Sequence, residues 1–249
     1  MTLSVKVCGL STPETLDAAL DAGADMVGFV RFPRSPRHVE LRQGRSLSDQ
    51  ARGRAARVLL LVDPDDAALA EAVEALDPDL IQLHGRETPE RVAAVRARFE
   101  RPIMKAVGIA EAADLAAIER YAGTADRILL DAKPPADPAA LPGGNGLPFD
   151  WRLLAALDLH DRFMLSGGLT PDTVAEAVAL TGIRAVDVSS GVERRPGEKE
   201  PDRIAAFVRA ARLAGEARFA GAARPAGDAR HAGDTPPADG ARPNPEEVA

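Results

Sequence analysis

The sequence predicts an α/β fold, a single (β/α)8 barrel of the TIM-barrel type followed by a disordered C-terminal tail. Short runs rich in Val, Ile and Leu alternate with Ala-rich amphipathic segments over residues 1–214. This alternation is typical of parallel strands joined by crossover helices. Eight strand-like runs occur, the number in a closed barrel, which usually takes about 250 residues. The composition then changes abruptly at Gly215.

The expected strands share β-branched or leucine-rich runs of the length that buried strands have. They are residues 3–8, 25–30, 56–62, 79–84, 102–107, 127–132, 162–167 and 185–190. An open doubly wound sheet is the competing arrangement. The segment KVCGLSTPE after the first strand lacks the G-x-G-x-x-G spacing of a nucleotide-binding loop, which favours the barrel.

The expected helices have apolar residues at helical spacing, and several open with Thr-Pro or Glu-Pro followed by an acidic residue, a helix N-terminal signature. They are residues 12–23, 65–76, 88–99, 112–122, 170–180 and 200–212, with weaker signals at 46–53 and 149–157.

The domain boundary follows from composition. Residues 1–214 form the expected catalytic barrel, and residues 215–249 are rich in Ala, Gly, Pro, Asp and Arg with few large apolar side chains. Such a segment buries too little apolar surface to offset the entropy of ordering, so we expect it to be disordered. A role of the tail in tethering a partner stays open.

Net charge and cysteine content limit the kinds of function and the cellular compartment that the sequence allows. The net charge of −7 argues against broad nucleic-acid binding but not against a small anionic ligand. One cysteine cannot form an internal disulfide, and no apolar run approaches the roughly 20 residues of a membrane-spanning helix. With no signal-peptide pattern, we expect a cytoplasmic protein with no membrane or nucleic-acid partner, either a monomer or a homodimer.

In such a barrel the active site lies at the carboxyl ends of the strands. Cys8 ends the first strand, and Lys6 shares its face one layer deeper. An ammonium group beneath a thiol favours the thiolate. The alternatives are that Cys8 is a small buried apolar residue and that Lys6 pairs with a buried carboxylate.

Two further strand ends carry titratable side chains. Asp131 follows the apolar run RILL, and such surroundings favour a protonated carboxyl group that serves as a general acid. A turn or helix-cap role is the alternative. His84 is a base, a donor or a structural residue. We expect no metal site, because the other histidines, His38, His160 and His231, show no ligand spacing.

The loop after the second strand, RFPRSPRHV, holds Arg31, Arg34 and Arg37 between stiffening prolines. Arginine binds a carboxylate with two hydrogen bonds, although a solvated basic loop is the alternative. The last two strands end in SGGLTPD and DVSSGVE. These loops occupy the usual phosphate site of such barrels, where glycines let backbone N–H groups approach an anion. The phosphate-binding candidates are Gly167, Gly168, Ser189, Ser190 and Gly191.

A thiol, an opposing carboxyl group and a phosphate site suit an isomerisation of a phosphorylated small molecule by one acid and one base. Seven stretches, in order from about residue 4 to residue 212, resemble motifs of the phosphoribosylanthranilate isomerase family: KVCGL, GADMVGFVRFPRSPRHV, QLHG, LLDAKPP, PGGNGLPFDW, LSGGLTPDTVAEA and DVSSGVE. One departure is Asn145 in Gly-Gly-Asn-Gly, where many members have Gly-Gly-Thr-Gly. We expect it to alter loop detail and not chemistry.

The resemblance implies an aldose–ketose isomerase of tryptophan biosynthesis without a cofactor, which converts N-(5-phosphoribosyl)anthranilate into 1-(2-carboxyphenylamino)-1-deoxyribulose 5-phosphate. It implies that Cys8 is the general base and Asp131 the general acid. It further implies that Arg37 holds the anthranilate carboxylate, that Asp187 faces the sugar and that His84 binds the substrate. The SGGL and SSG backbones would hold the phosphate.

Because the first and last strands are neighbours in a closed barrel, we also predict a buried ion pair between Lys6 and Asp187. Competing functions are another phosphosugar isomerase or epimerase, an indole-forming synthase, and a non-catalytic barrel that binds a phosphorylated metabolite. A synthase would need a set of Lys and Glu residues at its strand ends. A metal-dependent epimerase would need paired His and Asp ligands. Neither pattern is visible in the sequence.

Overall fold

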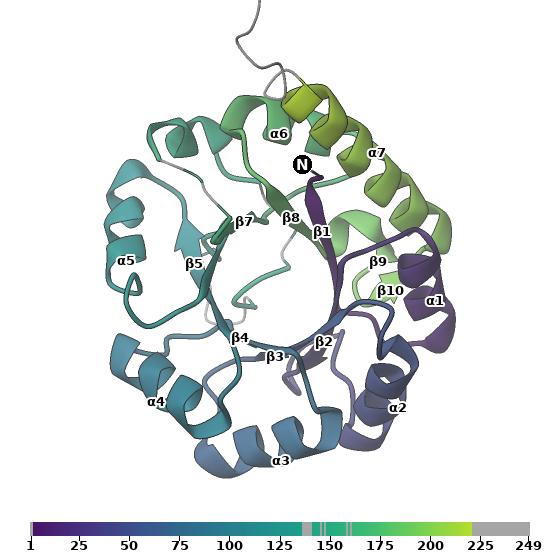
Figure 1. Cartoon of the computed structure of the whole chain (residues 1–249), viewed down its shortest axis with the longest axis vertical. Helices are drawn as coiled ribbons and strands as arrows, with labels where there is room; N and C mark the ends of the chain where they lie inside the picture. The colour runs from purple at the N-terminus through teal and green to yellow at the C-terminus, as the bar shows by residue number, and fades with distance from the viewer. Residues whose placement is uncertain are drawn as a thin grey trace, which may run out of the picture.

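The computed structural model describes residues 2–135, 141–144, 146, 148–157, 159 and 161–220. Eight parallel strands close into a barrel in chain order, with helices around the outside (Figure 1). The strands are β1 (Ser4–Cys8), β2 (Met26–Arg31), β3 (Ala56–Leu61), β4 (Leu80–Leu83), β5 (Ile103–Ile109), β6 (Arg127–Ala132), β7 (Phe163–Leu165) and β8 (Ala185–Val188). The predicted fold class is confirmed, and every expected strand is present.

The helical segments follow the strands in alternation. They are α1 (Pro13–Asp21), α2 (Leu41–Ala51), α3 (Asp66–Leu76), α4 (Pro89–Phe99), η1 (Ala112–Leu115), α5 (Ala116–Glu119), η2 (Trp151–Ala156), α6 (Val174–Thr181), η3 (Ser190–Val192) and α7 (Pro201–Phe219), where η marks a 3₁₀ helix. In α1, α3 and α4 the side chain of Thr12, Asp65 or Thr88 accepts a hydrogen bond from a backbone N–H of the first turn.

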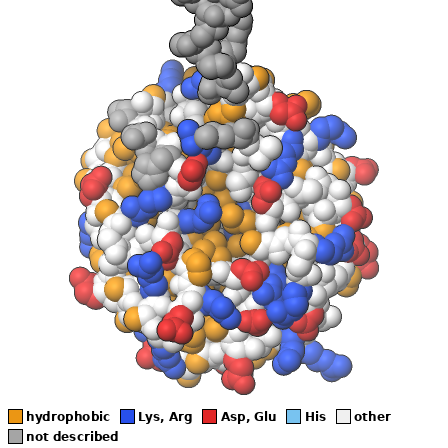
Figure 2. All heavy atoms as spheres, in the orientation of Figure 1, with side chains coloured by type: hydrophobic (Ala, Val, Ile, Leu, Met, Phe, Trp, Pro, Cys, Tyr) orange, Lys and Arg blue, Asp and Glu red, His pale blue; other side chains and the backbone are white. Residues whose placement is uncertain are grey.

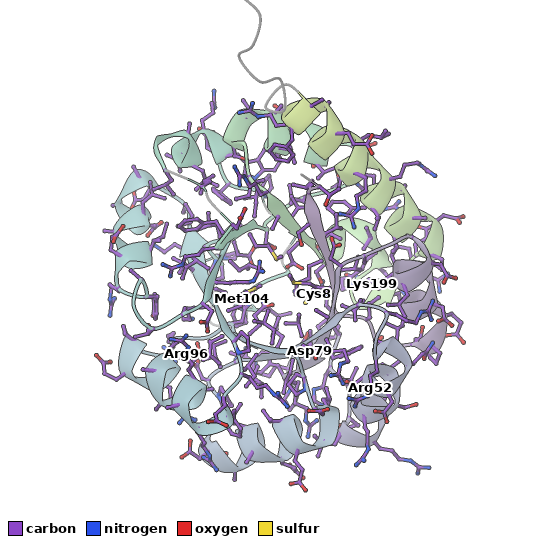
Figure 3. All side chains as sticks on the ribbon, in the orientation of Figure 1. Cys8, Arg52, Asp79, Arg96, Met104 and Lys199 are labelled. Carbon is purple, nitrogen blue, oxygen red and sulfur yellow. The ribbon has the colours of Figure 1, made fainter. Side chains whose placement is uncertain are left out.

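Side chains that alternate along the strands separate two apolar regions. The larger one lies between the strands and the helices. The smaller one fills the barrel interior and consists of Met26, Val58, Leu80, Met104, Leu129, Met164 and Ala185. Figure 3 shows Cys8 and Met104 within the ring of strands, whereas Arg52 and Arg96 lie outward among the helices. The filled layer makes the barrel a solid platform, and the site is built on its carboxyl end.

The amino ends of β2, β4 and β6 share a repeated feature. Asp25, Asp79 and Asp126 come directly before β2, β4 and β6, and each carboxylate accepts a hydrogen bond from a backbone N–H of the preceding strand, at 2.6–2.8 Å. Each also pairs with an arginine. The repeated aspartates satisfy backbone donors at the start of β1, β3 and β5.

On the face of the molecule that Figure 2 shows, charged side chains of both signs are interspersed around a central group of hydrophobic side chains.

The structure differs from the sequence prediction in two places that matter here. A hairpin of β9 (Glu193–Arg195) and β10 (Glu198–Lys199) follows β8 and was not expected. Helix α7 continues past residue 214 to Phe219, so the boundary expected at residue 214 falls inside a helix. Residues 221–249 of the predicted tail, Asn145 and His160 lie outside the described residues. Among those described, no helix is both long and apolar enough to cross a membrane.

Candidate active site

A cavity of about 810 Å³, part of it open to solvent, lies at the carboxyl ends of the strands. The cavity is lined by nine of the predicted site residues: Cys8, Arg37, His84, Asp131, Gly167, Gly168, Asp187, Ser189 and Ser190. The thiol and the carboxyl group that the sequence placed on opposite strands therefore face one shared space.

The Cys8 thiol sits at the end of β1 and is 3% exposed. Its neighbour across the strand pair is Gly28 of β2, where an added Cβ would lie 2.7 Å from the Cys8 Sγ. The absence of a side chain at residue 28 thus makes room for the sulfur. Beneath it, the Lys6 Nζ donates to the Asp187 Oδ1 at 2.9 Å, and both side chains are buried. The predicted Lys6–Asp187 ion pair is confirmed.

Burial raises the pKa of the Cys8 thiol above its usual value, and the Lys6 ammonium offsets this only in part. The Asp187 carboxylate adds to the rise. Lys6 acts to lower the thiol pKa, as the sequence predicts. Burial and the Asp187 carboxylate raise this pKa by more, so the net effect does not favour the thiolate. The raised pKa favours the protonated thiol over the thiolate.

Asp131 is 6% exposed at the end of β6 and is held on both oxygens. Its Oδ1 accepts from the backbone N–H of Ala132 at 2.9 Å, and its Oδ2 lies 3.1 Å from the His84 Nε2. The His84 Nδ1 in turn lies 2.9 Å from the side-chain amide of buried Gln82. Gly143 lies above the pair, where an added Cβ would sit 2.4 Å from the His84 Nε2. This row of contacts orients the carboxyl group toward the cavity.

Of the three arginines in the loop after β2, Arg37 is the one that lines the cavity. Arg31 instead contacts His38 and Glu40. Buried Arg37 donates from Nε and Nη2 to the two oxygens of Glu193, at 2.7 and 2.9 Å. Its Nη2 also donates to the Gly144 carbonyl at 3.1 Å.

The β7 and β8 loops form another edge of the cavity. Gly167 and Gly168 have φ of +80° and +69°, a conformation that side chains disfavour, and they line the cavity with Ser189 and Ser190. Gly191 does not line it. An added Cβ there would lie 1.9 Å from the Leu169 carbonyl oxygen, so this glycine allows the β8 loop to pack against the β7 loop.

An apolar wall completes the cavity on the side of β2 and β3. Val30, Phe32, Leu60 and Val62 line it beside Cys8. The cavity is therefore lined by an apolar wall, a guanidinium group, a thiol, a carboxyl group, and an edge of glycines and hydroxyls. No group of His, Cys, Asp or Glu side chains suited to a metal ion occurs among the described residues.

Sequence reasoning missed three buried polar residues of this region, Gln82, Glu193 and Lys199. Gln82 lies on β4 two residues before His84, which directly follows the strand, so the period of two places both side chains on one face and could have identified Gln82. Glu193 and Lys199 lie on the unpredicted hairpin and contact residues far away in the sequence, so no local pattern indicates their roles.

Comparison with known proteins gives a consistent result. A family model described as N-(5'-phosphoribosyl)anthranilate (PRA) isomerase matches residues 5–210. An N-(5'-phosphoribosyl)anthranilate isomerase of Azorhizobium caulinodans is 60% identical over 217 residues, which cover 87% of this chain and 95% of the relative. One of Rhodopseudomonas palustris is 59% identical over 216 residues, covering 87% and 99%.

Solved structures agree. The phosphoribosyl anthranilate isomerase of Thermotoga maritima superposes with a TM-score of 0.74 at 33% identity, covering 84% of this chain and 98% of that one. Another phosphoribosyl anthranilate isomerase, in complex with reduced 1-(o-carboxyphenylamino)-1-deoxyribulose 5-phosphate, gives 0.72 at 32% identity with the same coverage. These matches lead to one conclusion: the chain belongs to the N-(5'-phosphoribosyl)anthranilate isomerase family.

Proposed function

We propose that this chain isomerises N-(5-phosphoribosyl)anthranilate to 1-(2-carboxyphenylamino)-1-deoxyribulose 5-phosphate, a step of tryptophan biosynthesis. The observation that carries the proposal is that Cys8 and Asp131 line one cavity whose ends suit the two ends of this substrate. The apolar wall beside Arg37 fits an aromatic ring that bears a carboxylate, and the β7 and β8 loops fit a phosphate.

In the proposed reaction Asp131 is the general acid. It gives a proton to the ribose ring oxygen, the bond from that oxygen to C1 breaks, and a protonated imine forms. The His84 Nε2 contact at 3.1 Å and the Ala132 N–H hold the carboxyl group in place for this transfer. The positive imine then makes the C2–H bond acidic.

Cys8 is the proposed general base, which removes the proton from C2 to give an enolamine that tautomerises to the ketone. The raised pKa of the buried thiol means that the thiolate must form with the substrate bound or at higher pH. Charge on the cationic imine next to the thiol favours this ionisation. Asp187, fixed by Lys6 below, is the group proposed to face the sugar hydroxyls.

The test is to supply N-(5-phosphoribosyl)anthranilate and follow the loss of its fluorescence. We expect catalytic turnover by the purified chain and a loss of about 10²–10⁴-fold in Cys8→Ala. Binding of substrate without turnover would instead favour the non-catalytic phosphometabolite-binding barrel. Turnover of a different phosphosugar in place of this one would favour another isomerase.

A further inference from the structure

The β9–β10 hairpin packs against the loop that carries Arg37. The hairpin turns at Gly197, whose φ is +86°, and an added Cβ there would lie 2.5 Å from the Pro36 carbonyl oxygen. Lys199 ends the hairpin, and in the view of Figure 3 it lies beside Cys8. The backbone of the hairpin therefore touches the arginine loop next to Arg37.

Glu193, the first residue of the hairpin, is a buried carboxylate with four hydrogen-bond donors around it. Arg37 supplies two, at 2.7 and 2.9 Å, Lys199 one at 2.5 Å, and the Gly197 N–H one at 3.2 Å. Burial alone would raise the pKa of Glu193, but the Arg37 hydrogen bond and the Lys199 charge outweigh it and hold the pKa below its usual value. Glu193 is thus an ionised carboxylate that lies between the buried side chains of Arg37 and Lys199, and burial lowers the pKa of Lys199 below its usual value.

The Arg37 guanidinium has one direction left open. An added Cβ at Gly9 would lie 2.7 Å from the Arg37 Cδ, and one at Gly144 would lie 2.5 Å from its Nη1, so two glycines enclose the side chain. The Glu193 carboxylate and the Gly144 carbonyl accept the hydrogen bonds that Nε and Nη2 donate. Within the residues that the structure describes, Nη1 has no hydrogen-bond partner, which leaves it for a ligand in the cavity.

Lys199 connects this arginine to the loop after β8. Its Nζ donates to the backbone carbonyl of Ser189 at 3.1 Å and lies 3.2 Å from the Ser189 Oγ. The Ser189 Oγ also donates to the Cys8 carbonyl at 3.2 Å. A continuous row of buried and part-buried contacts therefore runs from Arg37 through Glu193 and Lys199 to the loop expected to hold phosphate.

We propose that Glu193 is a positioning residue for recognition of the substrate carboxylate. It fixes the direction of Arg37 and, with Lys199, the separation between the carboxylate-binding and phosphate-binding ends of the site. The inference rests on the proposed function, because that function assigns the substrate carboxylate to Arg37. A hairpin that served only to stabilise the fold would affect every ligand equally.

The experiment compares two ligands in Glu193→Gln by calorimetry. One is reduced 1-(o-carboxyphenylamino)-1-deoxyribulose 5-phosphate, and the other is the same compound without the carboxyl group. We expect about 10- to 100-fold weaker binding of the carboxylated ligand, the usual worth of an oriented charged hydrogen bond, and a change of less than about 3-fold for the other. Glu198→Gln, on the exposed Arg194–Glu198 pair of the same hairpin, is the matched control and should bind both ligands normally.

Glu193→Asp keeps the charge with a shorter reach and should give an intermediate loss for the carboxylated ligand alone. It carries the test if Glu193→Gln fails to fold, as judged by its melting temperature. Equal losses for both ligands, no loss, or tighter binding of the carboxylated ligand would overturn the proposal. Absence of turnover by the unmodified chain would instead refute the proposed function.

Discussion

The buried pair of Lys6 and Asp187 makes a quantitative prediction about stability. Lys6 is 0% exposed and Asp187 4% exposed, so Lys6→Met, of similar shape, leaves an unpaired carboxylate inside the barrel. Removing one partner of a buried pair costs about 3–5 kcal/mol. In a chain of this size each kcal/mol lowers the melting temperature by about 2–4 °C, so we expect a fall of about 6–20 °C.

The measurement is thermal unfolding at neutral pH, followed by circular dichroism. Burial is the largest single effect and acts to lower the pKa of Lys6, but the charges and hydrogen bonds of Asp187 and Cys8 together outweigh it and raise the net pKa. The contribution of Lys6 is therefore fully present below about pH 10.5 and is lost only as the pH rises beyond that. The double variant Lys6→Met/Asp187→Asn leaves no unpaired charge at these two positions and should melt above Lys6→Met. A Lys6→Met protein that melts within about 2 °C of the parent, or a double variant with additive losses, would refute this reasoning.

The remaining predictions concern the reaction. Cys8→Ala and Asp131→Asn should each lower kcat by about 10²–10⁴-fold in the fluorescence assay, and near-normal turnover in either would remove that residue from its assigned role. Arg37→Met should raise KM with a smaller effect on kcat, whereas a large loss of kcat at unchanged KM would contradict carboxylate binding. Because burial raises the pKa of Cys8, kcat/KM should increase with pH into the alkaline range, and Lys6→Met should move that rise to still higher pH. A rise that moved to lower pH would show that the titrating group is not this thiol.

The strand ends were predictable because the information is local. Cys8 and Asp131 each close an apolar run, and the barrel topology then brings them to one edge. The early start of α2 was not predictable, since the Glu40 side chain makes no capping hydrogen bond and the first turn lacks apolar periodicity. Gly215 reads as the start of a tail, yet it packs in α7 against Leu3, where an added Cβ would lie 2.6 Å from the Leu3 Cβ.

The partners of the buried polar groups were the least predictable part. Glu193 and Arg37 are separated by 156 positions, and neither the hairpin nor its turn has a strong local pattern. Burial of a carboxylate is tolerated only when its donors arrive from elsewhere in the fold. A sequence read in local windows does not show where those donors come from.

The aspartates that precede β2, β4 and β6 have a consequence for how the barrel comes apart. The corresponding position before β8 is Arg184, and β7 and β8 are aligned through a single residue pair, Leu165 with Val186. The seam least protected by backbone pairing thus runs beneath the two loops proposed to grip phosphate. In the protein without ligand, the amide hydrogens of β7 and β8 should therefore exchange faster than those of β2 and β3. A ligand that contacts both loops would stabilise this strand pair, so exchange in β7 and β8 should slow the most when the site is filled.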